Sequence, residues 1–268
     1  MNRWQWFSVS MIVWGSMSSA NADHAWGNYH WERSSNPITI GLGDNVDSRW
    51  QASLDGAAND WSASRVINTP VVAGTVSNPK RCRASTGKVE VCNDTYGNNG
   101  WLGIASIAIN GGHITSGVVK VNDTYYNSPT YDTPAWRNSV MCQEIGHILG
   151  LDHNDEDFNT TTGTCMDYSN NPEPNQHPDQ HDYQMLEQIY QHLDDEGGGG
   201  NPCKGKKCQS GMSAEDFFNN IDMNGPENWG RLLAARGGKA VYELNFGQGR
   251  RILTVVTWTL ERAREHQH

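Results

Sequence analysis

The pattern of hydrophobic and polar positions along the chain predicts both strands and helices. Alternating or continuous apolar positions favour short strands over residues 37–43, 71–76, 101–109 and 113–121. Apolar residues recur every three or four positions over residues 48–62, 134–149 and 182–193, which favours amphipathic helices. Residues 81–92 are expected to form a hairpin or loop. This mixture of elements indicates an α+β fold.

A run of glycines at residues 197–200 predicts a flexible break in the chain. We therefore divide the mature chain into a main domain over residues 23–195, a Gly-rich linker over 196–210 and a small module over 211–268. Within that module we expect a short helix over 212–220 and a hairpin of strands at 240–246 and 250–260, because Gly247-Gln248-Gly249 is a turn sequence. The module is either an accessory or docking unit or an extension packed on the main domain.

The first residues have the composition of a secretory signal peptide. Arg3 precedes an apolar stretch that reaches about Ser19, and Ala20-Asn21-Ala22 then provides a small-residue cleavage site. We expect residues 1–22 to be removed and the protein to be secreted, to the extracellular space or the periplasm. The alternative is an N-terminal anchor helix, although the stretch is short for a membrane span.

The net charge of the chain limits the classes of partner that it is expected to bind. The formal net charge is −10 at pH 7. An acidic chain is repelled by nucleic acid and by anionic membrane surfaces, so neither is an expected partner.

The cysteine count agrees with export to an oxidising compartment. Six cysteines indicate three disulfides in such a chain, with 15 possible pairings. Proximity in sequence favours Cys82–Cys92, Cys142–Cys165 and Cys203–Cys208. The second of these pairs would hold the segment before residue 166 against the helix over 134–149.

Residues 143–153 carry the candidate chemistry. Gln143 and His147 lie one helical turn apart on one face, which is the spacing that two metal ligands on a helix require. Glu144 is placed beside the first of them to act as a base on a water molecule at the metal. Gly150 is expected to end the helix and turn the chain, which brings His153 round as a third ligand.

This run resembles the metzincin metalloprotease motif His-Glu-x-x-His-x-x-Gly-x-x-His, with Gln143 in place of the first His. The resemblance covers about residues 23–195, where the order of elements is that of metzincin catalytic domains. The segment Trp50–Trp61 and the strand pair over 101–121 look most like the matrixin branch. It implies a catalytic domain with a twisted mixed sheet, an active-site helix, a Met-turn and a C-terminal helix. It also implies Zn²⁺ bound by Gln143, His147 and His153, with Glu144 as general base.

The first ligand position leaves several interpretations open. The Gln143 amide oxygen is four bonds from Cα, as His Nε2 is, so it can reach the same point, although it is a weaker donor to zinc. Alternatively, Gln143 only forms hydrogen bonds. A thiolate of Cys142 is a further candidate ligand, and His113, His177 or His181 could replace the missing imidazole.

Met166 and Tyr168 extend the resemblance downstream of the helix. Metzincins place a Met-turn beneath the metal, and two of their branches have Tyr two residues after that Met. The resemblance implies that Met166 forms an apolar floor. It also implies that Tyr168 binds the metal or donates a hydrogen bond to the tetrahedral intermediate, unless it is only a packed aromatic residue.

These residues predict a secreted zinc-dependent endopeptidase. The strand over 113–121 is expected to be the upper edge of the cleft, where a protein or peptide substrate would bind in an extended conformation as an added strand. The alternative is a metzincin-fold binding protein in which Gln143 has impaired catalysis.

Overall fold

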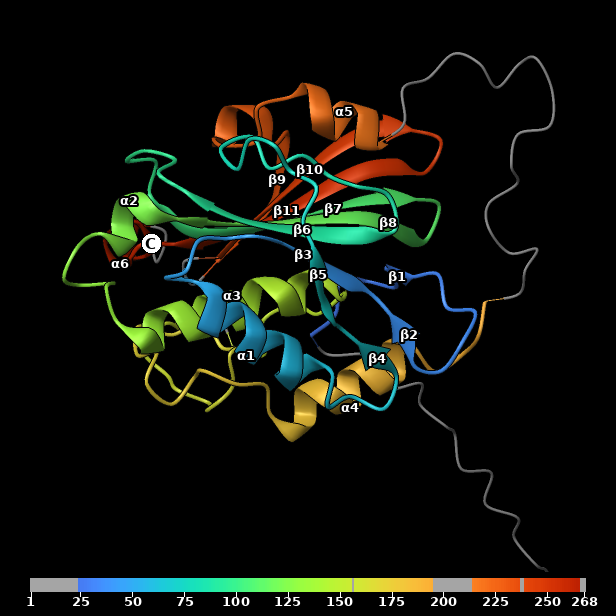
Figure 1. Cartoon of the computed structure of the whole chain (residues 1–268), viewed down its shortest axis with the longest axis horizontal. Coiled ribbons are helices and arrows are strands. Elements are labelled where there is room, and N and C mark those ends of the chain that lie inside the picture. The colour runs from blue at the N-terminus through green and yellow to red at the C-terminus, as the bar shows by residue number, and fades with distance from the viewer. Residues whose placement is uncertain (1–23, 156, 195–213, 237–238, 266–268) are drawn as a thin grey trace, which may run out of the picture.

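The computed structural model describes residues 24–155, 157–194, 214–236 and 239–265, and contains a large sheet with helices on both faces (Figure 1). The strands are β1 His30–Trp31, β2 Ile38–Thr39, β3 Gly41–Asn45, β4 Ile67–Asn68, β5 Val71–Ala73, β6 Lys88–Asp94, β7 Trp101–Asn110, β8 His113–Asn122, β9 Arg231–Arg236, β10 Lys239–Gly247 and β11 Arg250–Trp258. The helices are α1 Gln51–Trp61, α2 Asp123–Tyr126, α3 Pro134–Ile148, α4 Gln180–Ile189, α5 Ala214–Asn220 and α6 Leu260–Glu265, with a 3₁₀ turn at Pro226–Asn228.

The main sheet mixes parallel and antiparallel pairs, as the sequence predicts. Its order is β5-β3-β6-β8-β7-β11-β10-β9, with β1 paired to β8. The pairs β3–β5, β3–β6, β6–β8 and β1–β8 are parallel, whereas β7 is antiparallel to both its neighbours. Helices α1, α3 and α4 lie on one face and α5 lies on the other (Figure 1).

The C-terminal strands continue the main sheet. β11 pairs with β7 from Arg250 opposite Asn110 to Trp258 opposite Trp101. The described residues of this segment therefore form an extension of the main sheet, which is one of the two interpretations drawn from the sequence. The linker at 196–210 and the Cys203–Cys208 pair lie outside the described residues, as does the segment 1–22, so the predicted division of the chain stays a prediction.

The structure differs from the sequence-based expectations in three local features. β8 is an internal strand between β6 and β7, so residues 113–121 do not form an edge of the sheet. β6 and β9 are strands that the apolar pattern does not predict. The helix expected from residue 182 begins at Gln180, because Asp179 is its N-cap and accepts from the amides of His181 and Asp182 in a capping box.

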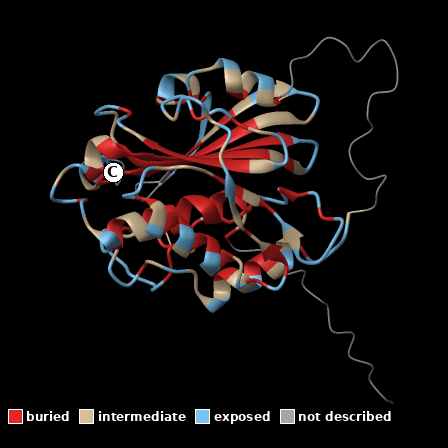
Figure 2. Cartoon of the chain, viewed as in Figure 1, coloured by how far each residue is buried: buried red, intermediate tan, exposed pale blue. Residues whose placement is uncertain are grey.

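Buried residues concentrate along the sheet and on α3 (Figure 2). Four tryptophans are fully buried: Trp50, Trp61, Trp101 and Trp229. Their large side chains contribute much of the apolar area that folding removes from water. Trp61 Nε1 also donates to the Cys142 carbonyl at 3.0 Å and so ties α1 to α3.

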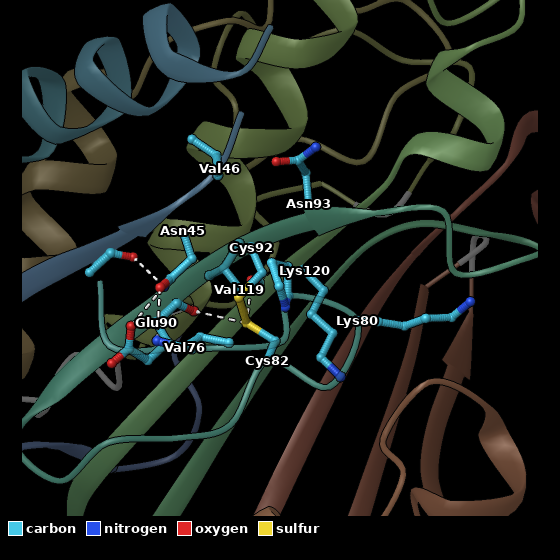
Figure 3. Close-up of a disulfide and its surroundings, with 12 residues drawn as sticks. Asn45, Val46, Val76, Lys80, Cys82, Glu90, Cys92, Asn93, Val119 and Lys120 are labelled. Carbon is cyan, nitrogen blue, oxygen red and sulfur yellow. Dashed lines mark hydrogen bonds between the residues drawn. A yellow bond between two sulfur atoms is a disulfide. The ribbon is translucent and has the colours of Figure 1, made fainter. Parts of the chain in front are cut away.

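Two of the three predicted disulfides, Cys82–Cys92 and Cys142–Cys165, are present. The first joins the loop before β6 to β6 itself, beside the buried Glu90 (Figure 3). Within the described residues, no helix combines the length and apolar character that crossing a membrane requires.

Glu90 is expected to make stability depend on acid pH. Burial alone would raise its pKa, but hydrogen bonds from Lys88, Ser85, Thr75 and Asn45 outweigh that effect and lower the pKa to about 2. A carboxylate with a depressed folded-state pKa contributes stability above its unfolded value of 4.5 and loses it as pH falls towards 2. We expect Glu90→Gln to lower the free energy of unfolding by about 3 kcal/mol at pH 7.

Urea unfolding of both proteins at pH 7 and pH 3 checks this expectation. The difference between them should shrink at pH 3, because the unfolded chain binds a proton at Glu90 there while the folded chain still resists it. A difference that is the same at both pH values would contradict the role of the charged form.

Candidate metal centre

The metal centre predicted from sequence is built on α3. The helix begins with Thr133 as N-cap, whose Oγ1 accepts from the Trp136 amide at 3.3 Å, and with Pro134 in the first turn. It ends before Gly150, which has a φ of 105°. A side chain at Gly150 would be strained in this conformation and would place Cβ 2.7 Å from the Tyr29 carbonyl oxygen. Gly150 therefore provides the expected turn towards His153.

The turn brings the two predicted imidazole ligands together. The Nε2 atoms of His147 and His153 lie 3.2 Å apart. Two nitrogens bound to one tetrahedral zinc at about 2.0–2.1 Å are separated by about 3.3 Å. His147 Nδ1 lies 2.9 Å from the Leu151 carbonyl oxygen, to which it can only donate, so its Nε2 keeps a lone pair for a metal. Both side chains are buried.

Gln143 is oriented by hydrogen bonds to the segment at residues 165–167. Its Nε2 donates to the carbonyl oxygens of Cys165 at 3.0 Å and Asp167 at 2.9 Å. These two acceptors require the amide nitrogen on that side, so Oε1 faces the opposite way, where Thr257 Oγ1 donates to it at 2.8 Å. Gln143 thus forms hydrogen bonds with nearby groups, which is one of the interpretations drawn from the sequence, and its oxygen accepts from β11.

Glu144 lies fully buried between α3 and the sheet. Burial raises its pKa to about 8, and the hydrogen bond with Thr257, at 2.6 Å from Glu144 Oε1, opposes that rise only in part. β7 approaches closely, since a Cβ on Gly103 would lie 2.5 Å from Glu144 Oε1. A hydroxyl has one proton to donate, so Thr257 can donate to only one of Gln143 Oε1 and Glu144 Oε1 at a time.

Tyr168 lies beside the second imidazole. Its ring centroid is 5.4 Å from that of His153, and its phenol donates to the Trp258 carbonyl oxygen at 3.4 Å. Burial keeps the pKa of the phenol well above its usual range, so the group is a proton donor near neutral pH. The predicted residues Gln143, Glu144 and Tyr168 therefore all contact β11 near its last residue.

Cys142 is part of a disulfide with Cys165, so it is not available as a thiolate ligand. Proximity in sequence predicts this pairing correctly. The disulfide joins α3 directly to the residue before Met166, and it holds the carbonyl that Gln143 contacts.

Met166 packs against α3 at Gly146. It is fully buried, and a Cβ on Gly146 would collide with Met166 Sδ and lie 2.7 Å from Trp61 Cζ2. Because this core is close-packed, Gly146 leaves the space that Met166 needs.

Gly146→Ala is expected to lower the free energy of unfolding by about 1–3 kcal/mol, because the added methyl group must displace Met166 or Trp61. Gly56→Ala is the matched control, since Gly56 lies inside α1 and a Cβ added to it would have nothing within 4 Å. That variant should be more stable by up to about 1 kcal/mol because Ala favours the helix. Urea unfolding of both variants measures the difference, and equal shifts would contradict the packing argument.

The histidines considered as replacements make other contacts. His177 Nδ1 lies 2.7 Å from Asp60, and His181 Nδ1 lies 3.0 Å from His24 Nε2. His113 Nε2 lies 3.3 Å from Asp194 Oδ1. The residue of this centre that the sequence does not reveal is Thr257. No local pattern gives a signal for it, because it lies more than a hundred residues from the helix it contacts.

Comparison with known proteins finds similarity at the level of structure. No protein-family model and no curated protein sequence matches the chain. Its structure is similar to high choriolytic enzyme 1, a hatching enzyme zinc-protease from Oryzias latipes (medaka fish), at 12% sequence identity and a TM-score of 0.33. The match covers 60% of this chain and 94% of that chain. At this level of similarity, function has to be argued from the side chains of the centre itself.

Proposed function

We propose that this chain is a secreted, metzincin-like zinc endopeptidase of the matrixin-like branch. The observation that carries the proposal is the 3.2 Å separation of the His147 and His153 Nε2 atoms, both buried, at the end of the helix that also carries the buried Glu144. Buried imidazoles beside a carboxyl group that can act as a base are the elements of a hydrolytic metal site.

The donor set fits zinc. His147 and His153 would supply nitrogen ligands, and the Gln143 carbonyl oxygen would supply the third. All three groups are neutral when they bind, so the site would keep the charge of a three-histidine centre. When bound, zinc polarises the scissile carbonyl and lowers the pKa of the hydrolytic water.

The remaining steps fall to the protein side chains. In its carboxylate form, Glu144 takes a proton from the attacking water while the water oxygen adds to the carbonyl carbon, and it then delivers that proton to the leaving amine nitrogen. The Tyr168 phenol donates a hydrogen bond to the oxyanion that forms. β7 runs beside Glu144, so an extended protein or peptide substrate would be held by main-chain hydrogen bonds along this strand.

A catalytically impaired binding protein is the second candidate. The observation in its favour is that Gln143 and Glu144 both contact Thr257, which belongs to the chain itself. In that case the fold would be retained without turnover.

Zinc content and casein hydrolysis of the purified mature protein, with and without a chelator, test the proposal together. We expect bound zinc and cleavage that the chelator abolishes and added zinc restores. Zinc with no cleavage of casein or of a mixed peptide library would favour the binding protein. Absence of both would show that Gln143 has disabled the centre.

A further inference from the structure

We propose that a second metal site, distinct from the centre on α3, is formed by His30, His113, His192 and Asp194. These residues come from β1, from the start of β8 and from the segment after α4. β1 pairs with β8 so that His30 lies directly opposite His113. The site therefore joins parts of the chain that are distant in sequence.

The four side chains converge on one point. The Nε2 atoms of His30, His113 and His192 each lie 3.3 Å from the same oxygen, Asp194 Oδ1. The ligand atoms of His30, His192 and Asp194 all lie within 4.8 Å of one another. Donor atoms around a tetrahedral zinc are separated by about 3.3 Å, so a bound ion would draw these three donors slightly closer together.

The proton positions favour a cation in this space. His30 Nδ1 lies 2.8 Å from the Asn28 carbonyl oxygen and must donate to it, so the neutral ring presents a lone pair at Nε2. That lone pair faces a carboxylate oxygen, an arrangement that repels unless a cation lies between the two atoms or the ring is charged.

The carboxylate is also held in place. Asp194 Oδ2 accepts from the Arg33 amide at 2.6 Å, and the Asp194 amide donates to the Arg33 carbonyl at 2.8 Å. Oδ1 is therefore left to face the imidazoles. Asp194 and His30 are largely shielded, whereas the His192 side chain is 53% exposed and gives a route for the metal.

His30, His192 and Asp194 would supply three ligands, and His113, whose Nε2 lies 3.3 Å from the same Asp194 oxygen, would close in as the fourth. Three imidazoles and one carboxylate would then leave no open position, which is the arrangement of a structural zinc site. A bound ion would clamp the end of α4 to β1 and β8. Loss of the ion should therefore affect stability, because a metal that binds only the folded chain stabilises it.

Metal analysis of the full mature chain tests this inference. We expect about two zinc ions per wild-type chain and about one in His192→Ala or in His113→Ala. His177→Ala is the matched control, because His177 is exposed and bonded to Asp60 instead. Thermal unfolding gives a readout apart from activity: chelation should lower the Tm of the wild type and of the control by more than it lowers that of His192→Ala.

The same measurement separates this site from the centre on α3. His147→Ala should also retain about one zinc ion, which would be the one bound by His30 and its neighbours. Cobalt substitution in that variant should give the visible absorption of a tetrahedral site. If His192→Ala and His113→Ala bind as much zinc as the wild type and respond equally to chelator, the cluster is an imidazole–carboxylate network without metal and the inference is wrong.

A second inference concerns β11 and rests on the proposed function. We infer that β11 covers the catalytic centre and must leave before a substrate can bind. β11 pairs with β7 along its whole length. This is the side of the sheet that would otherwise be an edge next to Glu144, where an extended substrate would add.

Contacts from the end of β11 also replace those of a substrate. Thr257 Oγ1 lies 2.8 Å from Gln143 Oε1 and 2.6 Å from Glu144 Oε1, and the Trp258 carbonyl accepts from Tyr168. Glu144, Gln143 and Tyr168, which are assigned to the water, the metal and the oxyanion, thus form hydrogen bonds with β11 of the chain itself. With β11 in this position, the Glu144 side chain has no exposure to solvent.

Thr257→Ala removes the hydroxyl and should raise peptide hydrolysis roughly tenfold, because the end of β11 loses the side-chain hydrogen bonds that hold it over Gln143 and Glu144. Thr254→Ala is the control, since Thr254 is buried on the same strand but bonds Ser106 at 2.9 Å instead. Amide hydrogen exchange in β7 and β11 should also become faster in Thr257→Ala than in Thr254→Ala.

The two readouts separate this inference from the proposed function. Faster exchange with no hydrolysis in either variant would support covering by β11 and count against the peptidase. Unchanged exchange and unchanged hydrolysis in Thr257→Ala, in a protein that cleaves casein, would overturn the covering role.

Discussion

Glu144→Ala is expected to lower kcat/KM for peptide hydrolysis by about 10³-fold or more, because the variant has no group to carry the proton from water to the leaving amine. The fold should be retained, since burying this carboxyl group, whose pKa burial raises to about 8, contributes little to stability. Zinc content should also be retained, because Glu144 is not one of the proposed ligands. Steady-state hydrolysis of a fluorogenic peptide and metal analysis on the same samples measure the two effects.

Glu187→Ala serves as the control for Glu144→Ala. Glu187 lies on α4 with its side chain 40% exposed, and its ion pair with Arg65 is 3.8 Å long. Its removal should leave hydrolysis within about twofold of the wild type, because exposed ion pairs contribute little. Wild-type rates in Glu144→Ala would contradict the assignment of Glu144 as the base.

Gln143→His is expected to raise zinc affinity by roughly tenfold or more, because imidazole is a stronger donor to zinc than an amide oxygen. Gln143→Ala should lower the affinity, since it removes the third ligand. The histidine variant loses the hydrogen bonds to the Cys165 and Asp167 carbonyls, so some of the gain will be offset. Competition with a chromophoric chelator gives the dissociation constant in each case.

Gln51→His is the control for a new imidazole, because Gln51 lies on α1, where its side chain donates to Asp55 at 3.1 Å on the exposed surface. Equal zinc affinity in the wild type, Gln143→His and Gln143→Ala would show that residue 143 does not bind the metal. If Gln143→His hydrolyses the peptide and the wild type does not, the wild type is the impaired binding protein.

The local features of the metal centre can be predicted from sequence. The spacing of Gln143 and His147, the helix start at Pro134 and the turn at Gly150 depend on neighbours within a few residues. Backbone geometry alone then places these groups on one face and brings His153 back towards the helix. The apolar patterns likewise predict the strands β7, β8, β10 and β11, because these patterns are local.

The position of each strand within the sheet is not predictable in this way. The sequence favours an edge position for residues 113–121, whereas β8 is internal, and the C-terminal hairpin extends the main sheet directly. A strand pattern shows which residues face inward, but the partner strand is chosen by packing between segments far apart in the chain.

The order of amino acids alone is enough to identify the candidate ligands, the candidate base and the two observed disulfide pairs. The contacts of Thr257 with Gln143 and Glu144, and the meeting of three imidazoles at Asp194, follow only from the folded arrangement. Both groups of contacts join residues that are far apart in the chain. Such contacts cannot be predicted from a periodicity or a short motif, because they depend on which strands pair and how the helices pack.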